Sequence, residues 1–161
     1  MLNIRTIHFA DEAEKLHLEK AMRKYASKRS SPLDFLSAQT DFKTEKKFLG
    51  YEGKGTLQFT RLRSSFEKFL PKLIVQIPKT NEKNYYQIRL SWSSTIPIGF
   101  MVFLFVILVW GMVIGAKDFR PMLGISIFCI GYPLWTFAEL HFTESKIEEA
   151  LKATIDVTVA V

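Results

Sequence analysis

The chain has 161 residues, of which 48% are apolar and 24% are charged, and its formal net charge is +6. This length leaves room for one modest domain, and the single cysteine, Cys129, excludes an intrachain disulfide and a cysteine-based zinc site. Residues 1–95 carry 18 basic and 10 acidic side chains, so the basic excess precedes the long apolar segments. Such charge suits anionic lipid headgroups. Because no nucleic-acid recognition motif accompanies it, we expect no nucleic-acid partner.

Residues 1–47 are predicted to form an N-terminal helical region followed by a linker. Asp11 and Glu14 have the spacing of a capping box, which predicts a helix over residues 11–29. Ser31 and Pro32 suit the N-cap and the first position of a second, short helix. The polar stretch 37–47 is typical of a linker.

Residues 48–95 are predicted to form a small β-rich cytoplasmic domain. Apolar and polar residues alternate over 56–60 and 86–92, and a third apolar run, 73–77, lies between two prolines. The glycine-rich stretch 50–55 is expected at a hairpin turn. A sheet of three or four strands needs a cover, which the bilayer surface, the N-terminal helices or a partner would supply.

The segment 61–72, between two of these strands, has two interpretations. Its leucines and phenylalanines have helical spacing and basic residues surround them, as in an amphipathic helix lying in the headgroup plane. The alternative is a strand and turn whose phenylalanines pack into the sheet. The predicted lipid-interface residues, which include a tryptophan before the first apolar segment and one near the end of the second, are Arg61, Arg63, Phe66, Lys68, Phe69, Lys72, Trp92 and Trp135.

Two apolar segments predict a transmembrane helical hairpin over residues 96–142. The first, 96–116, has 21 residues without a charge, and a helix of that length matches a hydrocarbon core of about 30 Å. The second, 121–140, begins with Pro121, which suits the first turn of a helix. Basic residues outside the hairpin place both termini in the cytoplasm, at the inner (plasma) membrane.

Residues 143–161 are predicted to form a C-terminal cytoplasmic helix and tail, either separate from the second apolar segment or continuous with it. The expected fold class is therefore an α+β membrane protein. It contains a small antiparallel sheet with N-terminal helices, a two-helix transmembrane hairpin and a C-terminal helix.

Four glycines in the apolar segments are candidates for close helix packing. Gly111 and Gly115 form a GxxxG pattern, and Gly124 and Gly131 are seven residues apart, so that they fall on one helix face. They would pack either within the hairpin or against a second copy or partner subunit.

The sequence contains no nucleophile elbow, phosphate loop or metalloprotease motif. We therefore expect no enzymatic activity, no cofactor and no metal site. Glu139 and His141, at the end of the second apolar segment, are the only candidates for a proton or ion path. The alternative is that the segment has simply reached the membrane interface there.

Several features of residues 48–150 occur together in a particular order. A glycine-marked strand (53–59) is followed by Ser65 and Phe66 with Pro71 beyond them, then by an alternating strand, two apolar segments and an acidic-started tail helix. In this order the chain resembles a loose group of small, uncharacterised bacterial membrane proteins. The resemblance implies two transmembrane helices and a cytoplasmic β-rich segment, and it implies no activity.

Together these features predict a non-enzymatic adaptor, anchored in the membrane, that binds a protein partner or anionic lipid at the cytoplasmic face. The alternative is an oligomeric accessory or pore-forming subunit of a channel, transporter or membrane-acting effector. Two spans per chain would require a homo-oligomer to line a path.

Overall fold

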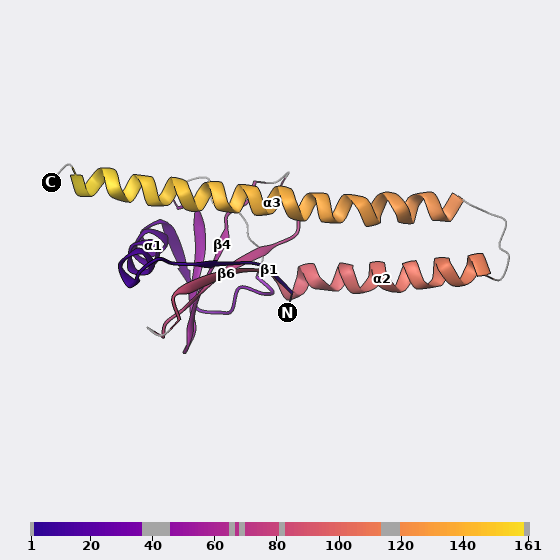
Figure 1. The fold of residues 1–161 in the computed structure, drawn as a ribbon, viewed down its shortest axis with the longest axis horizontal. Coiled ribbons are helices and arrows are strands. Elements are labelled where there is room, and N and C mark those ends of the chain that lie inside the picture. The colour runs from indigo at the N-terminus through magenta and orange to yellow at the C-terminus, as the bar shows by residue number, and fades with distance from the viewer. Residues whose placement is uncertain are drawn as a thin grey trace.

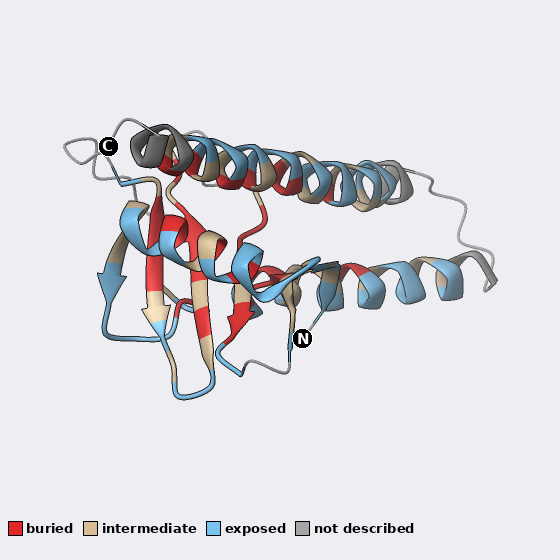
Figure 2. Ribbon diagram, turned by 60° about the vertical axis from the view of Figure 1, so that its left-hand side comes forward, coloured by how far each residue is buried: buried red, intermediate tan, exposed pale blue. Residues whose placement is uncertain are grey.

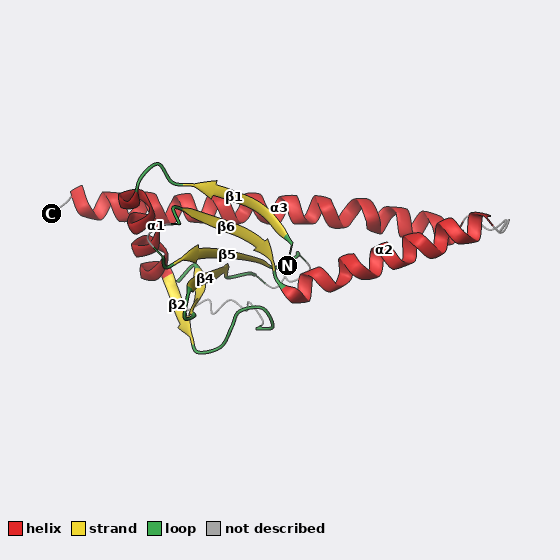
Figure 3. Ribbon diagram, turned by 60° about the horizontal axis from the view of Figure 1, so that its bottom comes forward, coloured by secondary structure: helices red, strands yellow, loops and turns green. Residues whose placement is uncertain are grey.

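The computed structural model describes residues 2–36, 46–64, 67, 70–80, 83–113 and 120–159, without the side chains of 112–113, 120–123 and 155–159. Its elements in chain order are β1 (Asn3–His8), α1 (Glu12–Tyr25), β2 (Ala26–Arg29), β3 (Phe48–Glu52), β4 (Thr56–Arg61), β5 (Leu73–Pro78), β6 (Tyr85–Leu90), α2 (Trp92–Val113) and α3 (Arg120–Val159). A sheet lies at one end of the molecule, and α2 and α3 extend away from it side by side (Figures 1 and 3).

The sheet has six strands in the order β1-β6-β5-β4-β3-β2. Strand β2 pairs in parallel with β3, and all other neighbours are antiparallel. The predicted strands over 56–60 and 73–77 are confirmed as β4 and β5, and residues 53–55 connect the β3–β4 hairpin as expected. The predicted strand over 86–92 is confirmed as β6 up to Leu90, but Trp92 begins α2 instead of ending the strand. Both edge strands were missed, because each is short and polar and owes its conformation to pairing with a neighbour rather than to its own pattern.

Helix α1 carries the chain from one edge of the sheet to the other. Asp11 Oδ1 accepts a hydrogen bond from the Glu14 amide at 2.7 Å, and Glu14 reaches back to the Ala10 amide at 2.9 Å. This confirms the predicted reciprocal cap. The helix ends at Tyr25, so the last four residues of the predicted helix are strand β2 instead.

The main core lies between one face of the sheet and two helices, α1 and the C-terminal half of α3. Its buried members include Met22 of α1, Phe48, Phe59 and Ile88 of the sheet, and Ile147 of α3. Figure 2 shows that buried residues gather on the strands and on the side of α3 that faces them, whereas most of α2 is exposed. Parts of the predicted N-terminal, β-rich and C-terminal regions therefore share one core.

The opposite face of the sheet has a smaller cluster formed by Leu33, Leu49 and Ile74. Its cover is the segment 33–36, which is a turn and not the predicted short helix. The backbone carbonyls of Leu33 and Leu36 accept hydrogen bonds from the Lys72 ammonium, which holds this turn on the sheet.

The prediction of a two-helix transmembrane hairpin is wrong. In the described part of the chain one helix is long and apolar enough to cross a membrane, over Trp92–Gly111. Helix α3 runs for 40 residues through Pro133, which confirms that the C-terminal helix continues the second apolar segment. From Tyr132 onward one side of α3 is buried, with Glu139 and Leu140 packed against the sheet. The second segment is thus apolar partly because it packs against protein.

Candidate membrane-attachment site

Helix α2 exposes an unusual amount of apolar surface. Its sequence contains no charged residue over its 22 positions, and only its beginning contacts the sheet region. Its exposed large apolar side chains are Trp92, Ile96, Phe100, Val102, Phe103, Phe105, Val106, Ile107, Val109 and Trp110. Large contiguous apolar surfaces of this kind mark sites of interaction with proteins or membranes. The neighbouring stretch of α3 adds further exposed residues, namely Ile127, Phe128, Ile130, Leu134, Trp135 and Phe137.

The first turn of α2 is fixed to the sheet by polar contacts. Asp34 Oδ1 accepts a hydrogen bond from the Trp92 amide at 3.1 Å, which places a carboxylate at the positive end of the helix. Ser91 caps the same turn, because its Oγ accepts from the Ser94 amide at 3.3 Å. The Tyr132 hydroxyl of α3 donates to the Ser94 carbonyl, so both long helices are connected at this point.

Two buried cations hold the turn 33–36 in place. Arg89 of β6 binds Asp34 through two hydrogen bonds of 2.8 and 2.9 Å, and this interaction lowers the pKa of the Asp34 carboxyl. Lys72 binds the carbonyls of Leu33 and Leu36. Burial, reinforced by the Arg63 charge, lowers the pKa of Lys72 to about 8.

The residue at the tip of this turn, Phe35, points outward. It is 78% exposed, although Leu33 and Asp34 beside it are buried. Two other exposed apolar residues lie at the same end of the sheet: Trp92 begins α2, and Leu2 accepts a hydrogen bond from the Leu90 amide through its carbonyl. We call Leu2, Phe35 and Trp92 the apolar collar. Its members lie close to the point where α2 leaves the sheet, because Leu2 is hydrogen-bonded to Leu90 and Asp34, next to Phe35, is hydrogen-bonded to Trp92.

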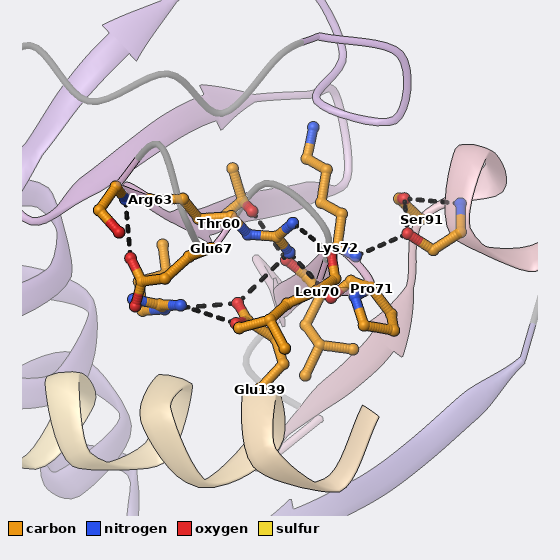
Figure 4. A network of polar contacts seen from close by, with 12 residues as sticks. Thr60, Arg63, Glu67, Leu70, Pro71, Lys72, Ser91 and Glu139 are labelled. Atoms are coloured by element: carbon orange, nitrogen blue, oxygen red, sulfur yellow. Dashed lines mark hydrogen bonds and ion pairs between the residues drawn. The ribbon is translucent and has the colours of Figure 1, made fainter. Parts of the chain in front are cut away.

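A second buried group of charges joins the sheet to α3. Arg61, the last residue of β4, contacts Glu139 Oε2 at 2.7 Å and Glu67 Oε1 at 2.7 Å. Arg63 lies 3.3 Å from Glu139 Oε1 and donates to the carbonyls of Leu70 and Pro71. Figure 4 shows Glu139 directed from α3 toward the segment that carries Arg63 and Glu67. Two positive and two negative groups compensate one another, which buried charges require.

The residues predicted to lie at the lipid interface differ in their exposure. Arg61, Arg63 and Lys72 are buried among the partners named above, so they do not face headgroups as predicted. Trp92 and Trp135 are exposed on α2 and α3. Phe66, Lys68 and Phe69 lie outside the described residues. The described part of 61–72 comprises a strand end, an isolated bridge and a 3₁₀ residue at Glu67. Because both phenylalanines lie outside the described residues, the choice between the two interpretations of this segment stays open.

The predicted helix-packing glycines are open in the structure. A Cβ added at Gly111, Gly124 or Gly131 would meet nothing within 4 Å, and Gly115 lies outside the described residues. These glycines therefore do not mediate close packing inside the chain, and packing against a second copy stays a prediction. The side chain of Glu139 is 1% exposed and paired with Arg61 and Arg63, so in this structure it is an internal ion-pair partner and not an open group of an ion path. His141 is exposed.

No group of three histidine, cysteine or acidic side chains is arranged to hold a metal ion among the described residues. The buried Asp34–Arg89 and Arg61–Glu139 pairs were not recognised from sequence.

Comparisons with models of protein families, with curated proteins and with solved structures found no match. The resemblance to small bacterial membrane proteins accordingly stays a prediction.

Proposed function

We propose that this protein is a non-enzymatic adaptor attached to a membrane by α2. The observation that carries the proposal is the exposed apolar surface of α2, which has the length and composition of a membrane-crossing helix. The apolar collar supports it, because aromatic residues such as Trp92 favour the boundary between hydrocarbon and headgroups. Because β1 belongs to the sheet and the C-terminal half of α3 packs on it, a single complete crossing by α2 would separate them. We therefore propose that α2 inserts into the bilayer, with the exposed apolar stretch of α3 beside it (Figure 1), and that the chain does not end on the other side.

We place the sheet on the cytoplasmic side of the inner (plasma) membrane. Strand β1 and the C-terminal half of α3 pack on the same sheet, so both ends of the chain belong to that side. The basic excess of residues 1–95 favours a membrane surface that carries anionic lipid. In this arrangement the sheet, α1 and the end of α3 present a surface for a protein partner next to those headgroups.

The membrane part of the proposal is tested with lysines on α2. Phe103→Lys and Val106→Lys replace two exposed residues three positions apart, and a lysine at the centre of a membrane helix costs about 2.5–3.5 kcal/mol. We expect the wild-type protein to resist carbonate extraction from membranes and the double variant to be released. The matched control, Ala13→Lys with Leu16→Lys, has the same spacing on exposed positions of α1 and should remain bound. Release of the wild-type protein by carbonate would contradict the proposal.

The adaptor part is tested by extracting the full chain in mild detergent and measuring its particle mass. A foreign protein present in stoichiometric amount supports the adaptor. A discrete homo-oligomer without one supports the second candidate, an accessory or pore-forming subunit. The open faces at Gly111, Gly124 and Gly131 favour that candidate, since they leave room for a helix of another copy.

A further inference from the structure

An apolar cavity lies at the fork where α2 and α3 leave the sheet. Its volume is about 370 Å³, which falls within the range of small-molecule sites, about 300–1,000 Å³. Leu2 and Ile4 of the first strand region form one wall, Ile98 and Met101 of α2 form the second, and Tyr132 and Phe137 of α3 form the third. On the face that α1 and α3 cover, the sheet thus leaves a space beside its edge strand β1.

The two side-chain hydroxyl groups of the lining already donate hydrogen bonds to backbone carbonyls. The Tyr132 hydroxyl donates to the Ser94 carbonyl, and Thr136 Oγ1 donates to the Tyr132 carbonyl at 2.9 Å. Among the residues that the structure describes, no charged side chain lines the cavity. A polar or charged ligand would therefore lose its hydration without gaining a partner, whereas a hydrocarbon chain would lose nothing by entering.

The cavity is continuous with the surface that we place in the membrane. Ile98 and Met101 belong to the apolar segment Trp92–Gly111, and Phe137 of α3 is exposed next to the opening. A chain in the bilayer beside α2 can therefore enter without crossing water. We infer that this cavity binds one acyl chain of a membrane lipid, an inference that rests on the proposed membrane attachment of α2.

The test fills the cavity with a larger side chain. Ile98→Trp places an indole against a half-buried lining position, and the control Ile96→Trp makes the same change two residues earlier, where the side chain is 64% exposed. The full chain is extracted in detergent, its retained phospholipid is counted by native mass spectrometry, and it is titrated with a fluorescent long-chain fatty acid. We expect the wild type and Ile96→Trp to retain lipid and bind the fatty acid, and Ile98→Trp to bind it about tenfold more weakly, a change of about 1.4 kcal/mol.

A second variant, Thr136→Phe, fills the cavity from the opposite wall and keeps the test informative if Ile98→Trp does not fold. Equal binding by the wild type and by a folded cavity-filling variant would overturn the inference. A wild-type protein that resists carbonate but binds no fatty acid would also overturn it, and would leave the proposed attachment standing. If carbonate releases the wild type, the attachment fails, and the fatty-acid titration in detergent still decides whether the cavity binds an acyl chain.

Discussion

The sheet with its covering helices and the pair of long helices beyond it distribute polarity in opposite ways. Around the sheet, Arg61, Arg89 and Glu139 are buried. Along α2, Phe103 and Trp110 are exposed. In water, charged side chains are normally exposed and large apolar side chains are normally buried, so both regions depart from the usual arrangement. The two regions are therefore adapted to different environments. Around the sheet, the buried charges pair with one another. Along α2, the apolar side chains are covered by no part of the described chain.

The largest effect that would sharpen this comparison comes from breaking a buried charge pair. Glu139→Gln leaves Arg63 without an acidic partner and Arg61 with Glu67 alone. Removing one member of a buried pair costs about 3–5 kcal/mol. We expect a loss of that order in the free energy of unfolding, measured by denaturant titration of the full chain in detergent with circular dichroism.

The control for this loss is Glu148→Gln, an exposed change on the same helix that should alter stability by less than about 0.5 kcal/mol. The triple variant Arg61→Leu, Arg63→Leu and Glu139→Leu removes the buried charges together and leaves only Glu67, whose side chain is 27% exposed. It should recover part of the loss, since isolated buried charge is what costs most. Equal stability of Glu139→Gln and Glu148→Gln would show that the pair does not hold α3 to the sheet.

A smaller effect is expected from Lys72, the cation that fixes the turn next to the collar. Its pKa of about 8 lies below its ordinary value of 10.5, so between these pH values the unfolded chain binds more protons than the folded one. Stability therefore rises as pH increases from about 8 toward 10.5, by roughly 1–2 kcal/mol after allowance for solvent screening. The measurement is the unfolding midpoint between pH 7.5 and 9.5.

The matched variant for this prediction is Lys72→Met, which should lose the increase with pH while keeping most of the side-chain volume. The window ends at pH 9.5 because burial raises the pKa of Tyr86 to about 12. Ionisation of that tyrosine in the unfolded chain would lower stability again above about pH 10. A wild-type profile that is flat, or parallel to that of Lys72→Met, would contradict the assigned pKa.

The central strands and α1 could be predicted because each carries its own pattern. Alternation marks 56–60 and 86–92, and Asp11 with Glu14 marks the start of α1. The edge strands β1 and β2 could not be predicted, since their hydrogen-bond partners lie more than 20 residues away along the chain in both cases. The error over α3 has a similar origin, because a window of apolar residues does not reveal whether lipid or a sheet covers them.

The buried pair of Arg61 and Glu139 could have been predicted from the sequence, because both residues occupy positions where the pattern expects an apolar side chain. Arg61 continues the alternation of Leu57 and Phe59, so it falls on the core face of its strand. Glu139 ends an apolar segment in the same way. Two charges of opposite sign at positions that the pattern reserves for apolar residues predict a buried pair, because neither could be buried alone. The exposure of Phe35, by contrast, depends on tertiary contacts with Lys72 and Arg89 and had no such signal.

The smallest effect concerns which end of the sheet meets the membrane. In a Cys129→Ser background, a cysteine at position 35 or at position 16 is labelled with a polarity-sensitive fluorophore, and the protein is reconstituted in vesicles. Both wild-type residues, Phe35 and Leu16, are exposed apolar side chains, at 78% and 67%. Because only Phe35 belongs to the collar at the start of α2, we expect a blue-shifted emission at 35 and a water-like emission at 16.

Quenching by brominated lipids compares the same two positions by their distance from the lipid chains, so that contacts of the fluorophore with the protein do not affect the result. Bromine near the top of the acyl chains should quench the fluorophore at position 35 and leave that at position 16 unchanged, since the turn 33–36 holds its tip beside Trp92 through the Asp34 hydrogen bond. Bromine at the chain ends should quench neither, because an interfacial residue stays near the headgroups. Equal quenching at both positions would mean that the sheet lies flat on the bilayer, and quenching at 16 alone would place the collar away from it.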